Sequence, residues 1–326
     1  MSAPSCPPSL TAHIDQYLRD QRRLGRRYRG VASVLRQLTI RLGACGCCDL
    51  DATSYAQWCH SMESLHPNTR RKAQQVVRAF SLYRARTAPA CFVPSVETFT
   101  RPCEYVRPFI IEPHQICRML SVADELPPGV PESLTPAAAR IAVVLLYTAG
   151  LRLGELLRLR LDDLRDRGAT LYINESKFHR SRFVPLSRSA QRELTGYLAQ
   201  RTALTRTLRD AGWLVAHRRL GGLSGYSMPG MSALLGRVFA RSGIRDAAGR
   251  RPRCHDLRHS FAVQSLIRGY RSDADVQSLL PKLAIYMGHA SVASTAHYLK
   301  LIPAVAALAS QRFERHFGQL GTQVTP

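Results

Sequence analysis

The stretch "TPAAARIAVVLLYTAG", residues 135–150, decides the fold of the second half of the chain. It begins with a Thr-Pro pair, which favours a helix start, and ends at Gly150, which favours a helix stop. Because it is apolar almost all round, it predicts a buried core helix. "LRLGEL" follows directly, and an arginine beside a core helix is costly unless it is paired. Arg152 therefore needs a partner, and Glu155, three residues on, is the candidate.

The segments on either side of this helix predict a mainly α fold with a small antiparallel β-sheet. "EPHQICRMLSVADEL" (112–126) is a further candidate helix. "GATLYINESKFHRSRFVPLS" (168–187) has two strand-like pieces joined by a polar turn, which predicts a hairpin with Lys177 at its tip. The chain from residue 189 onward reads as helices and loops, and 203–232 is the part richest in loops.

The beginning of the chain predicts a separate helical domain. The apolar residues of "LTAHIDQYLRDQRRL" (10–24) recur at the spacing of one helix face. "HPNTRRKAQQVVRAFSLYRAR" (66–86) combines an apolar stripe with a basic stripe, the arrangement that a phosphate-tracking surface needs. Its candidate nucleic-acid contacts are Arg71, Lys72 and Arg78, and a merely solvated charged face is the alternative.

A proline-rich stretch separates this domain from the rest. "APACFVPSVETFTRPCEYVRP" (88–108) carries four prolines and little helical period, so it predicts a linker or domain boundary. We expect a helical domain at 1–88, a linker at 89–108, and a second domain at 109–326 that ends in an amphipathic tail.

The chain is strongly basic. Its 326 residues include 46 basic and 23 acidic ones, a net charge of +23, which indicates nucleic acid as the first candidate partner and an anionic membrane as the second. No basic amphipathic helix with exposed aromatic residues supports the membrane alternative, and the longest apolar run, 141–149, is far shorter than a membrane span. With 45% hydrophobic residues and no secretory pattern, we expect a soluble cytoplasmic protein that joins the nucleoid when bound to DNA.

The cysteines do not indicate a disulfide framework or a metal site. Nine of them, an odd number, are scattered along the chain, as is typical of reduced thiols. "CGCC" (45–48), with Cys59 and His60 nearby, could be read as a zinc site, but no second pair lies at finger-like spacing. We therefore expect no metal and no cofactor.

Residues suited to metal-free cleavage of a phosphodiester lie in the second half. Such cleavage needs fixed guanidinium groups for the charge that accumulates on phosphate oxygens, a nucleophile from the protein, and a proton for the departing oxygen. "HDLRH" places His255 and Arg258 three apart, on one helix face, with His259 next to them. "GHASVASTAHYL" puts His289 after a glycine turn and Tyr298 beyond it.

A lysine completes this set. Lysine can donate a proton where arginine, with its far higher pKa, is poorly suited. Only four lysines occur in the chain, and Lys177 is the one at a predicted hairpin tip. Lys282 is its competitor, but it lies inside a helical run.

Four stretches together resemble the tyrosine recombinases of the lambda-integrase type, the phage integrase family. They are "TAGLRLGEL", "SKFHRSRFVPL", "HDLRHSFA" and "YMGHASVASTAHYL", which occur in the family's order across most of residues 140–300. "DADVQSLLPKLAIYMGH" (273–289) resembles the recombinases of transposons and similar mobile elements. The resemblance implies a catalytic tyrosine recombinase fold preceded by a helical core-binding (SAM-like) domain, no cofactor, and no metal in the chemistry.

The resemblance also implies roles for individual residues. Arg152 and Arg258 would clamp the scissile phosphate, and Lys177 would protonate the leaving 5′ oxygen. His255 would help to position the phosphate and accept the tyrosine proton. His289 would hydrogen-bond a nonbridging oxygen.

Tyr298 would be the nucleophile. It would form a 3′-phosphotyrosine link, which the 5′ hydroxyl of a partner strand then reverses. Glu155 and His259 would be supporting residues, and Arg180 and Arg182 are reasonable phosphate contacts on the hairpin side.

The implied partners are duplex DNA and further copies of the chain, as a dimer on one site and a tetramer around paired sites, with sister recombinases of the same element as further candidates. The amphipathic tail would dock on a neighbouring subunit or on its own domain. Three alternatives remain open: a type IB topoisomerase-like enzyme, a catalytically silent DNA-binding regulator, and a metal nuclease that uses the histidines. Each candidate residue also has a simpler structural interpretation; Arg152 could do no more than pair with Glu155, and Tyr298 could be a core aromatic.

Overall fold

The computed structural model forms two compact units, Met1–Val106 and Arg107–Pro326. It describes residues 9–25, 28–104, 106–127, 133–174, 181–205, 209–219, 221–272, 276–289, 291, 295–296, 307 and 310–311. Candidate residues Lys177, Arg180 and Tyr298 lie outside the described residues.

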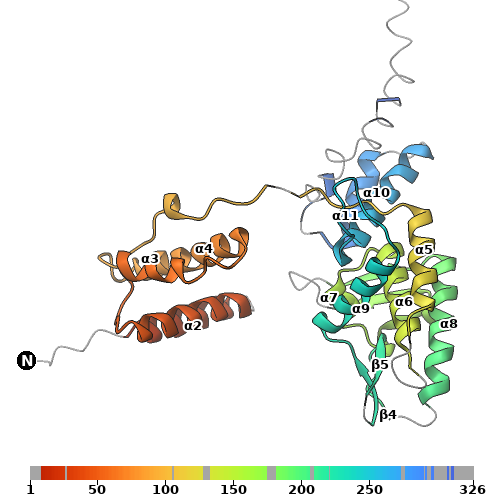
Figure 1. Cartoon of the computed structure of the whole chain (residues 1–326), viewed down its shortest axis with the longest axis horizontal. Coiled ribbons are helices and arrows are strands. Elements are labelled where there is room, and N and C mark those ends of the chain that lie inside the picture. Colours follow the sequence, from red (N-terminus) through yellow and green to blue (C-terminus); the bar gives the residue numbers. More distant parts are fainter. Residues whose placement is uncertain are drawn as a thin grey trace, which may run out of the picture. The chain divides into compact units, whose positions relative to one another are not determined.

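The first unit is helical, as the sequence predicts (Figure 1). Its elements are α1 (Leu10–Arg23), α2 (Arg29–Ala44), α3 (Ala52–His60), α4 (Pro67–Arg84) and the short 3-10 helix η1 (Val96–Thr98). The expected apolar face of α1 is buried, and on α4 the side chains of Val77 and Phe80 are fully buried. Pro67 occupies the first turn of α4, where its missing N–H costs nothing.

Polar side chains of α4 hold the segment that follows it. Asn68 and Gln74 accept hydrogen bonds from the backbone N–H groups of Cys103 (3.0 Å) and Thr100 (2.8 Å). Arg71 and Arg78 also donate to carbonyls of this segment, and the four residues follow one another at intervals of three or four, the spacing of one helix face. Much of the expected linker therefore packs along α4.

The second unit contains seven helices in its described part, with short strands between them (Figure 1). The helices are α5 (Pro113–Asp124), α6 (Thr135–Thr148), α7 (Leu153–Leu156), α8 (Arg188–Thr205), α9 (Met228–Arg241), α10 (Cys254–Arg271) and α11 (Val276–Met287). Helix α6 packs against α5, α8, α9 and α10 and contributes eight buried residues, so the prediction of a central core helix is confirmed. The helix ends at Thr148, with Ala149 as its C-cap, and the next residue, Gly150, has a φ of +59° that favours glycine.

The predicted hairpin is present as part of a three-stranded antiparallel sheet. This sheet has the order β1-β2-β3, with β1 at Leu164–Arg165, β2 at Thr170–Ile173 and β3 at Arg182–Pro185, and it is preceded and interrupted by 3-10 turns η2 (Leu161–Asp163) and η3 (Asp166–Gly168). Leu171 and Val184 are opposite each other and fully buried, which fixes the register of the sheet.

A second three-stranded sheet shows that the expectation of only helices and loops after residue 189 is wrong for part of the chain. Its order is β4-β6-β5, with β4 at Arg209–Asp210, β5 at Ala216–Arg219 and β6 at Gly222–Gly225. The sequences "AHRR" and "GLSG" contain few β-branched or aromatic residues. The strands are instead held by backbone pairing and by a small apolar cluster with Leu134.

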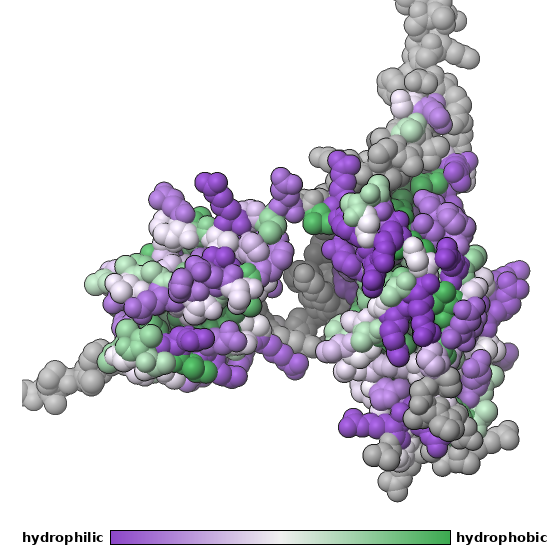
Figure 2. Space-filling view, in the orientation of Figure 1, coloured by the Kyte–Doolittle hydropathy of each residue, from purple (hydrophilic) through white to green (hydrophobic). Residues whose placement is uncertain are grey.

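The surface of both units is largely polar. Hydrophilic residues spread over the visible face of each unit, with apolar ones interspersed (Figure 2). None of the described helices is both long enough and apolar enough to cross a bilayer.

Replacing Gly150 by alanine should destabilise the second unit. A Cβ there would lie 2.4 Å from Cδ1 of Phe261, and the positive φ disfavours any side chain. We expect Gly150→Ala to lower the free energy of unfolding by about 2–4 kcal/mol, the range of overpacking combined with backbone strain. The matched control is Gly196→Ala on α8, where no atom lies within 4 Å of the new Cβ. Chemical denaturation should show the control to be neutral or slightly stabilising, whereas equal effects of the two changes would contradict the role given to Gly150.

Candidate active site

Arg152 lies at the turn that separates α6 from α7. It is the N-cap residue of α7, and the Glu155 side chain accepts a hydrogen bond from its backbone N–H at 2.9 Å. The guanidinium donates to Glu155 Oε1 at 2.7 Å, so the pair expected from the sequence is present. One local motif thus caps the helix and orients the arginine.

Glu155 is the centre of an arginine cluster. Its side chain is 1% exposed, and besides Arg152 it binds Arg182, whose Nη1 and Nη2 donate to the two carboxylate oxygens at 3.2 and 3.0 Å. Arg258 Nη1 lies 3.9 Å from Glu155 Oε2. Burial alone would raise the pKa of Glu155, but hydrogen bonds and charge from Arg182, together with Arg152, lower it to about 2. The carboxylate is therefore ionised, and one negative charge stands against three guanidinium groups.

The end of α11 is bound by the same three arginines. Arg182 Nε donates to the carbonyl of Tyr286 at 2.7 Å. Arg258 Nη2 donates to the carbonyl of Met287 at 2.7 Å, and Arg152 Nη2 donates to that of Gly288 at 2.8 Å. These carbonyls lack helical partners, and they lie at the negative end of the helix dipole. The guanidinium groups donate hydrogen bonds to these carbonyls and place positive charge at the negative end of the dipole.

Gly288 sets the position of His289. It has φ +67°, its N–H donates to the Ile285 carbonyl, and the N–H of His289 donates to the Ala284 carbonyl. This pair of hydrogen bonds is a Schellman cap, which the left-handed glycine makes possible. The Nδ1 atom of His289 lies 2.7 Å from Oγ1 of the fully buried Thr295. The turn at Gly288 thus fixes the backbone of His289, and Thr295 fixes the orientation of its ring.

Three histidines adjoin the cluster in the neutral form. His255 is partly exposed, but desolvation of its ring by the surrounding atoms and the charge of Arg258 lower its pKa. Burial and the neighbouring His255 lower the pKa of His259 to about 4, and the two rings meet edge to face at 4.5 Å. Burial, followed by the charges of Arg258 and Arg152, lowers the pKa of His289 to about 4. Neutral imidazoles beside fixed positive charges can accept a proton or donate a hydrogen bond to phosphate.

The site therefore assembles residues that are far apart in the sequence. Arg152, Glu155, His255, Arg258 and His289 come together with His259 beside them, as their hydrogen bonds and mutual electrostatic effects show. Arg258 is 1% exposed and also donates to the Gly150 carbonyl, so α10 joins the ends of α6 and α11.

Arg182, which the sequence suggested as a phosphate contact on the hairpin side, lies in the cluster around Glu155. Its side chain is 9% exposed, and its three described hydrogen bonds go to Glu155 and Tyr286. The sequence did not predict that Arg182 binds Glu155 and the end of α11, and it did not predict that Thr295 contacts His289. The alternation of β3 could have indicated Arg182, because it has the same inward parity as the buried Val184.

The candidate DNA contacts of the first unit differ in their surroundings. Arg71 donates to the Thr100 carbonyl at 3.1 Å, and Arg78 donates to the Pro94 carbonyl. Both side chains are half-buried, whereas Lys72 is exposed. The two arginines thus have a structural task in holding the segment after α4.

No group of three or more potential ligands from His, Cys, Asp and Glu is placed to hold a metal ion within the described ranges. The cysteines of the "CGCC" stretch are free thiols.

The profile of the phage integrase family matches residues 110–303. The chain belongs to the phage integrase family. The y4rB protein of Sinorhizobium fredii (strain NGR234), whose name places it among integrases and recombinases, is 33% identical over 242 residues, which is 74% of this chain and 76% of that protein. Tyrosine recombinase XerD of Mycobacterium tuberculosis is 36% identical over 160 residues, 49% of this chain and 46% of its own length. The predicted class, a tyrosine recombinase that carries out site-specific DNA recombination, is confirmed.

Solved structures agree with the fold of this family member. The Tn1549 transposon integrase in complex with transposon right end DNA superposes with a TM-score of 0.64 over 94% of this chain and 99% of that chain, at 16% identity. A lambda integrase (75–356) dimer bound to a core site gives a TM-score of 0.57 over 87% of this chain and 96% of that chain, also at 16% identity. The mainly α fold with small sheets is thus confirmed.

Arg182 should be a positioning residue for catalysis. Arg182→Gln removes donors to Glu155 and to the α11 end, so the active-site geometry should loosen by an ångström or so, which costs on the order of 100-fold in rate. Arg182→Lys should recover little, because an ammonium group cannot replace the planar fork. The measurement is single-turnover covalent-adduct formation with DNA at saturation, with the exposed Arg188→Gln as the matched control. A wild-type rate in Arg182→Gln, with its fold intact, would contradict the assignment.

The half-buried His259 and His289 should make the DNA-free chain less stable in mild acid. In the unfolded chain a histidine titrates near 6.5, whereas His259 and His289 have pKa values of about 4 in the fold. Between these values the unfolded state binds more protons, so the free energy of unfolding falls as the pH falls from about 6.5 to 4.

Replacing His259 by glutamine should reduce the slope of the free energy of unfolding against pH by up to the contribution of about one bound proton. Urea unfolding at a series of pH values measures the slope. Exposed His114→Gln should keep the wild-type slope, and an unchanged slope in His259→Gln would show that this interpretation of the buried ring is incorrect.

Proposed function

We propose that this chain cuts and rejoins DNA with Tyr298 as the nucleophile and the Arg152–Arg258 pair as the binding site of the scissile phosphate. The observation that carries this proposal is the convergence of three arginines on one buried carboxylate and on the end of α11. The cluster has an excess of positive charge, and a phosphodiester would supply the missing negative charge. Arg152 is 24% exposed, so part of its donor fork is accessible to a ligand.

The proposed reaction is a pair of transesterifications. The Tyr298 oxygen attacks phosphorus, His255 accepts the phenolic proton, and the bond from phosphorus to the 5′ oxygen breaks. Lys177 gives that oxygen its proton, which leaves a 3′-phosphotyrosine and a free 5′ hydroxyl. A 5′ hydroxyl of the partner strand then attacks the phosphotyrosine and releases Tyr298. The number of phosphoester bonds stays constant, so no external energy source is needed.

The arginine pair supplies the electrostatic stabilisation. The equatorial oxygens gain negative charge as the nucleophile approaches, and preorganised donors in a partly buried site stabilise that charge more than water would. His289 would donate to a nonbridging oxygen, and its contact with Thr295 supports this role because it orients the ring. The neutral state of His255 suits its proposed task of accepting the tyrosine proton.

We further propose duplex DNA as the partner and a mobile element as the source of its sites. The net charge of +23 supports a DNA partner, and the transposon integrase among the similar structures was solved with transposon end DNA. A lambda integrase in this group is a dimer on its core site, which supports a dimer on one site here. A tetramer on paired sites and sister recombinases as additional partners are further parts of the proposal. Such a protein would work on nucleoid DNA in the cytoplasm.

The proposal is tested with a suicide substrate, a duplex nicked close to the cleavage position, whose site comes from DNA flanking the gene. The wild-type chain should form a covalent adduct that maps to Tyr298 by peptide mass spectrometry. Tyr298→Phe should abolish the adduct and keep DNA affinity within about threefold, because only a hydroxyl is removed.

Three outcomes separate the alternatives. Undiminished adduct formation in a chelator would exclude the metal nuclease. Relaxation of a supercoiled plasmid without strand exchange between paired sites would favour the topoisomerase-like alternative. Binding without any adduct from the wild-type chain would favour the silent regulator and contradict the proposal.

A further inference from the structure

Tyr286 links the two apolar cores of the second unit. It lies in the last turn of α11, and it packs both against the large core around α6 and against the smaller core formed by α10 and α11. Its ring stacks on Phe261 of α10, with 5.4 Å between the ring centroids and 24° between the ring planes. Phe261 in turn lies against Gly150, where an added Cβ would come within 2.4 Å of the ring. One aromatic side chain therefore connects α11 with α10 and, through Phe261, with the turn that carries Arg152.

The hydroxyl group of Tyr286 adds a contact with the hairpin. It donates to the carbonyl of Pro185 at 3.0 Å. Pro185 is the last residue of β3, the edge strand of its sheet, so this hydrogen bond satisfies a carbonyl of that strand. Desolvation by the surrounding atoms raises the pKa of the hydroxyl to about 12, so the group stays protonated at neutral pH and remains a donor.

Tyr286 therefore holds β3 at two points. Its backbone carbonyl accepts the hydrogen bond from Nε of Arg182 at the start of the strand, and its side chain binds the carbonyl at the end of the strand. Two contacts with the same strand fix both its position and its direction along α11. The direction of β3 determines where the Arg182 guanidinium meets Glu155, to which it donates at 3.0 and 3.2 Å. Glu155 in turn accepts a hydrogen bond from Arg152.

We propose that Tyr286 is a positioning residue for the reaction, because its hydroxyl group aligns β3 so that Arg182 can hold Glu155. Glu155 then orients Arg152, which binds the scissile phosphate under the proposed function, and the inference rests on that function. The single hydroxyl proton of Tyr286 is used by the Pro185 carbonyl. The side chain therefore acts through β3 and not on the phosphate itself.

The variant Tyr286→Phe tests the proposal, because it keeps the ring and removes only the hydroxyl group. Single-turnover adduct formation at saturating DNA should slow by about 5–10-fold, the effect of one lost hydrogen bond on the active-site geometry. DNA affinity should stay within about twofold of the wild type, since many phosphate contacts contribute to it. A loss of rate without a loss of affinity is the pattern of a residue that acts on the reacting geometry.

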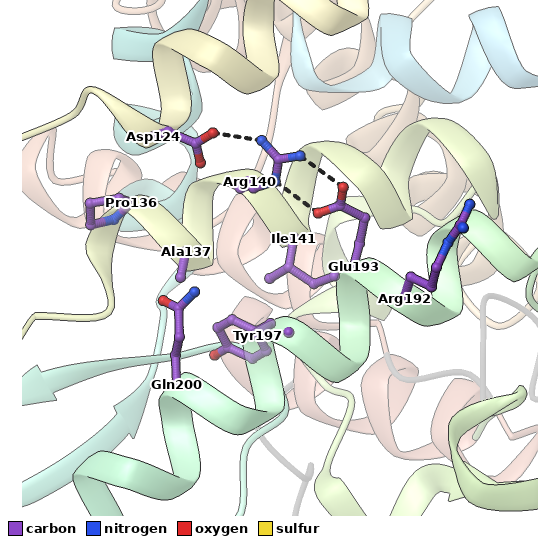
Figure 3. A pocket seen from close by; sticks show the side chains of 10 residues that line it. Asp124, Pro136, Ala137, Arg140, Ile141, Arg192, Glu193, Tyr197 and Gln200 are labelled. Carbon is purple, nitrogen blue, oxygen red and sulfur yellow. Dashed lines mark hydrogen bonds and ion pairs between the residues drawn. The ribbon is translucent and has the colours of Figure 1, made fainter.

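Tyr197 on α8 provides a matched control for the loss of a tyrosine hydroxyl. It lines the cavity of about 410 Å³ shown in Figure 3, and none of the described residues that line this cavity is a candidate catalytic residue. Its hydroxyl accepts a hydrogen bond from the N–H of Ala216 on β5 at 3.0 Å, so it too joins a helix to a strand. Because Tyr197 is only 3% exposed, Tyr197→Phe should destabilise the fold at least as much as Tyr286→Phe, as chemical denaturation measures. Its adduct rate should nevertheless stay within about twofold of the wild type.

A double-mutant cycle tests the route through Arg182. If Tyr286 acts by placing this arginine, Tyr286→Phe should slow the Arg182→Gln variant by less than about twofold, because the alignment of β3 has no further effect once the guanidinium is gone. The cycle is measured on the adduct rate at saturating DNA. Tyr197→Phe combined with Arg182→Gln is the reference for two changes that do not interact.

Three results would overturn the inference: a wild-type rate in Tyr286→Phe, an equal loss of rate in Tyr286→Phe and Tyr197→Phe, or full additivity of Tyr286→Phe with Arg182→Gln. Failure of the proposed function looks different. If the wild-type adduct maps to Tyr286 by peptide mass spectrometry, Tyr286 is the nucleophile, and both its positioning role and the assignment of Tyr298 are wrong. If the wild-type chain binds its site without forming any adduct, the proposed function fails and the inference fails with it.

Discussion

The end of helix α11 is the constraint on which the site depends. Its last turn presents carbonyl groups that have no helical partner, and three arginines from three different elements each bind one of them. The buried Glu155 carboxylate accepts hydrogen bonds from two of these arginines and lies close to the third. These hydrogen bonds fix the end of α11, strand β3 and the starts of α7 and α10 to one another.

Under the proposed function, this arrangement would also prepare the site for a phosphate. Glu155 neutralises only part of the charge of the cluster, and the histidines around it are kept neutral by burial and by the same guanidinium groups. Donors that are already oriented need no reorganisation when charge develops on a phosphate, which is the main advantage of a preorganised site. The cost is a buried set of charges whose members depend on each other, since removing one leaves the others uncompensated.

Much of this could be predicted from the sequence because the signals are local. The apolar stretch that forms α6, the Arg152–Glu155 pair three residues apart and the two arms of the hairpin each follow from neighbouring residues. Contacts between distant segments could not be predicted in this way. The alternation of β3 indicates that Arg182 points inward, but nothing near it in the chain shows that its partners are Glu155 and the end of α11.

The same limit explains the other differences. The second sheet could not be predicted because its strands are only two to four residues long and partly polar. Arg71 and Arg78 lie on the expected stripe of α4, but backbone carbonyls from about 16 to 29 residues further on occupy their donors. Periodicity identifies which face of a helix is polar, whereas the partner of that face depends on where the rest of the chain returns.

The most direct measurement of the central claim is the rate of covalent-adduct formation by Arg258→Ala on two substrates, one with the normal scissile phosphate and one with a neutral methylphosphonate in its place. If the guanidinium acts by neutralising phosphate charge, its loss should slow the reaction by about 100–1,000-fold on the phosphate and by little on the methylphosphonate. An equal loss on both substrates would contradict the account, because Arg258 would then only maintain the fold.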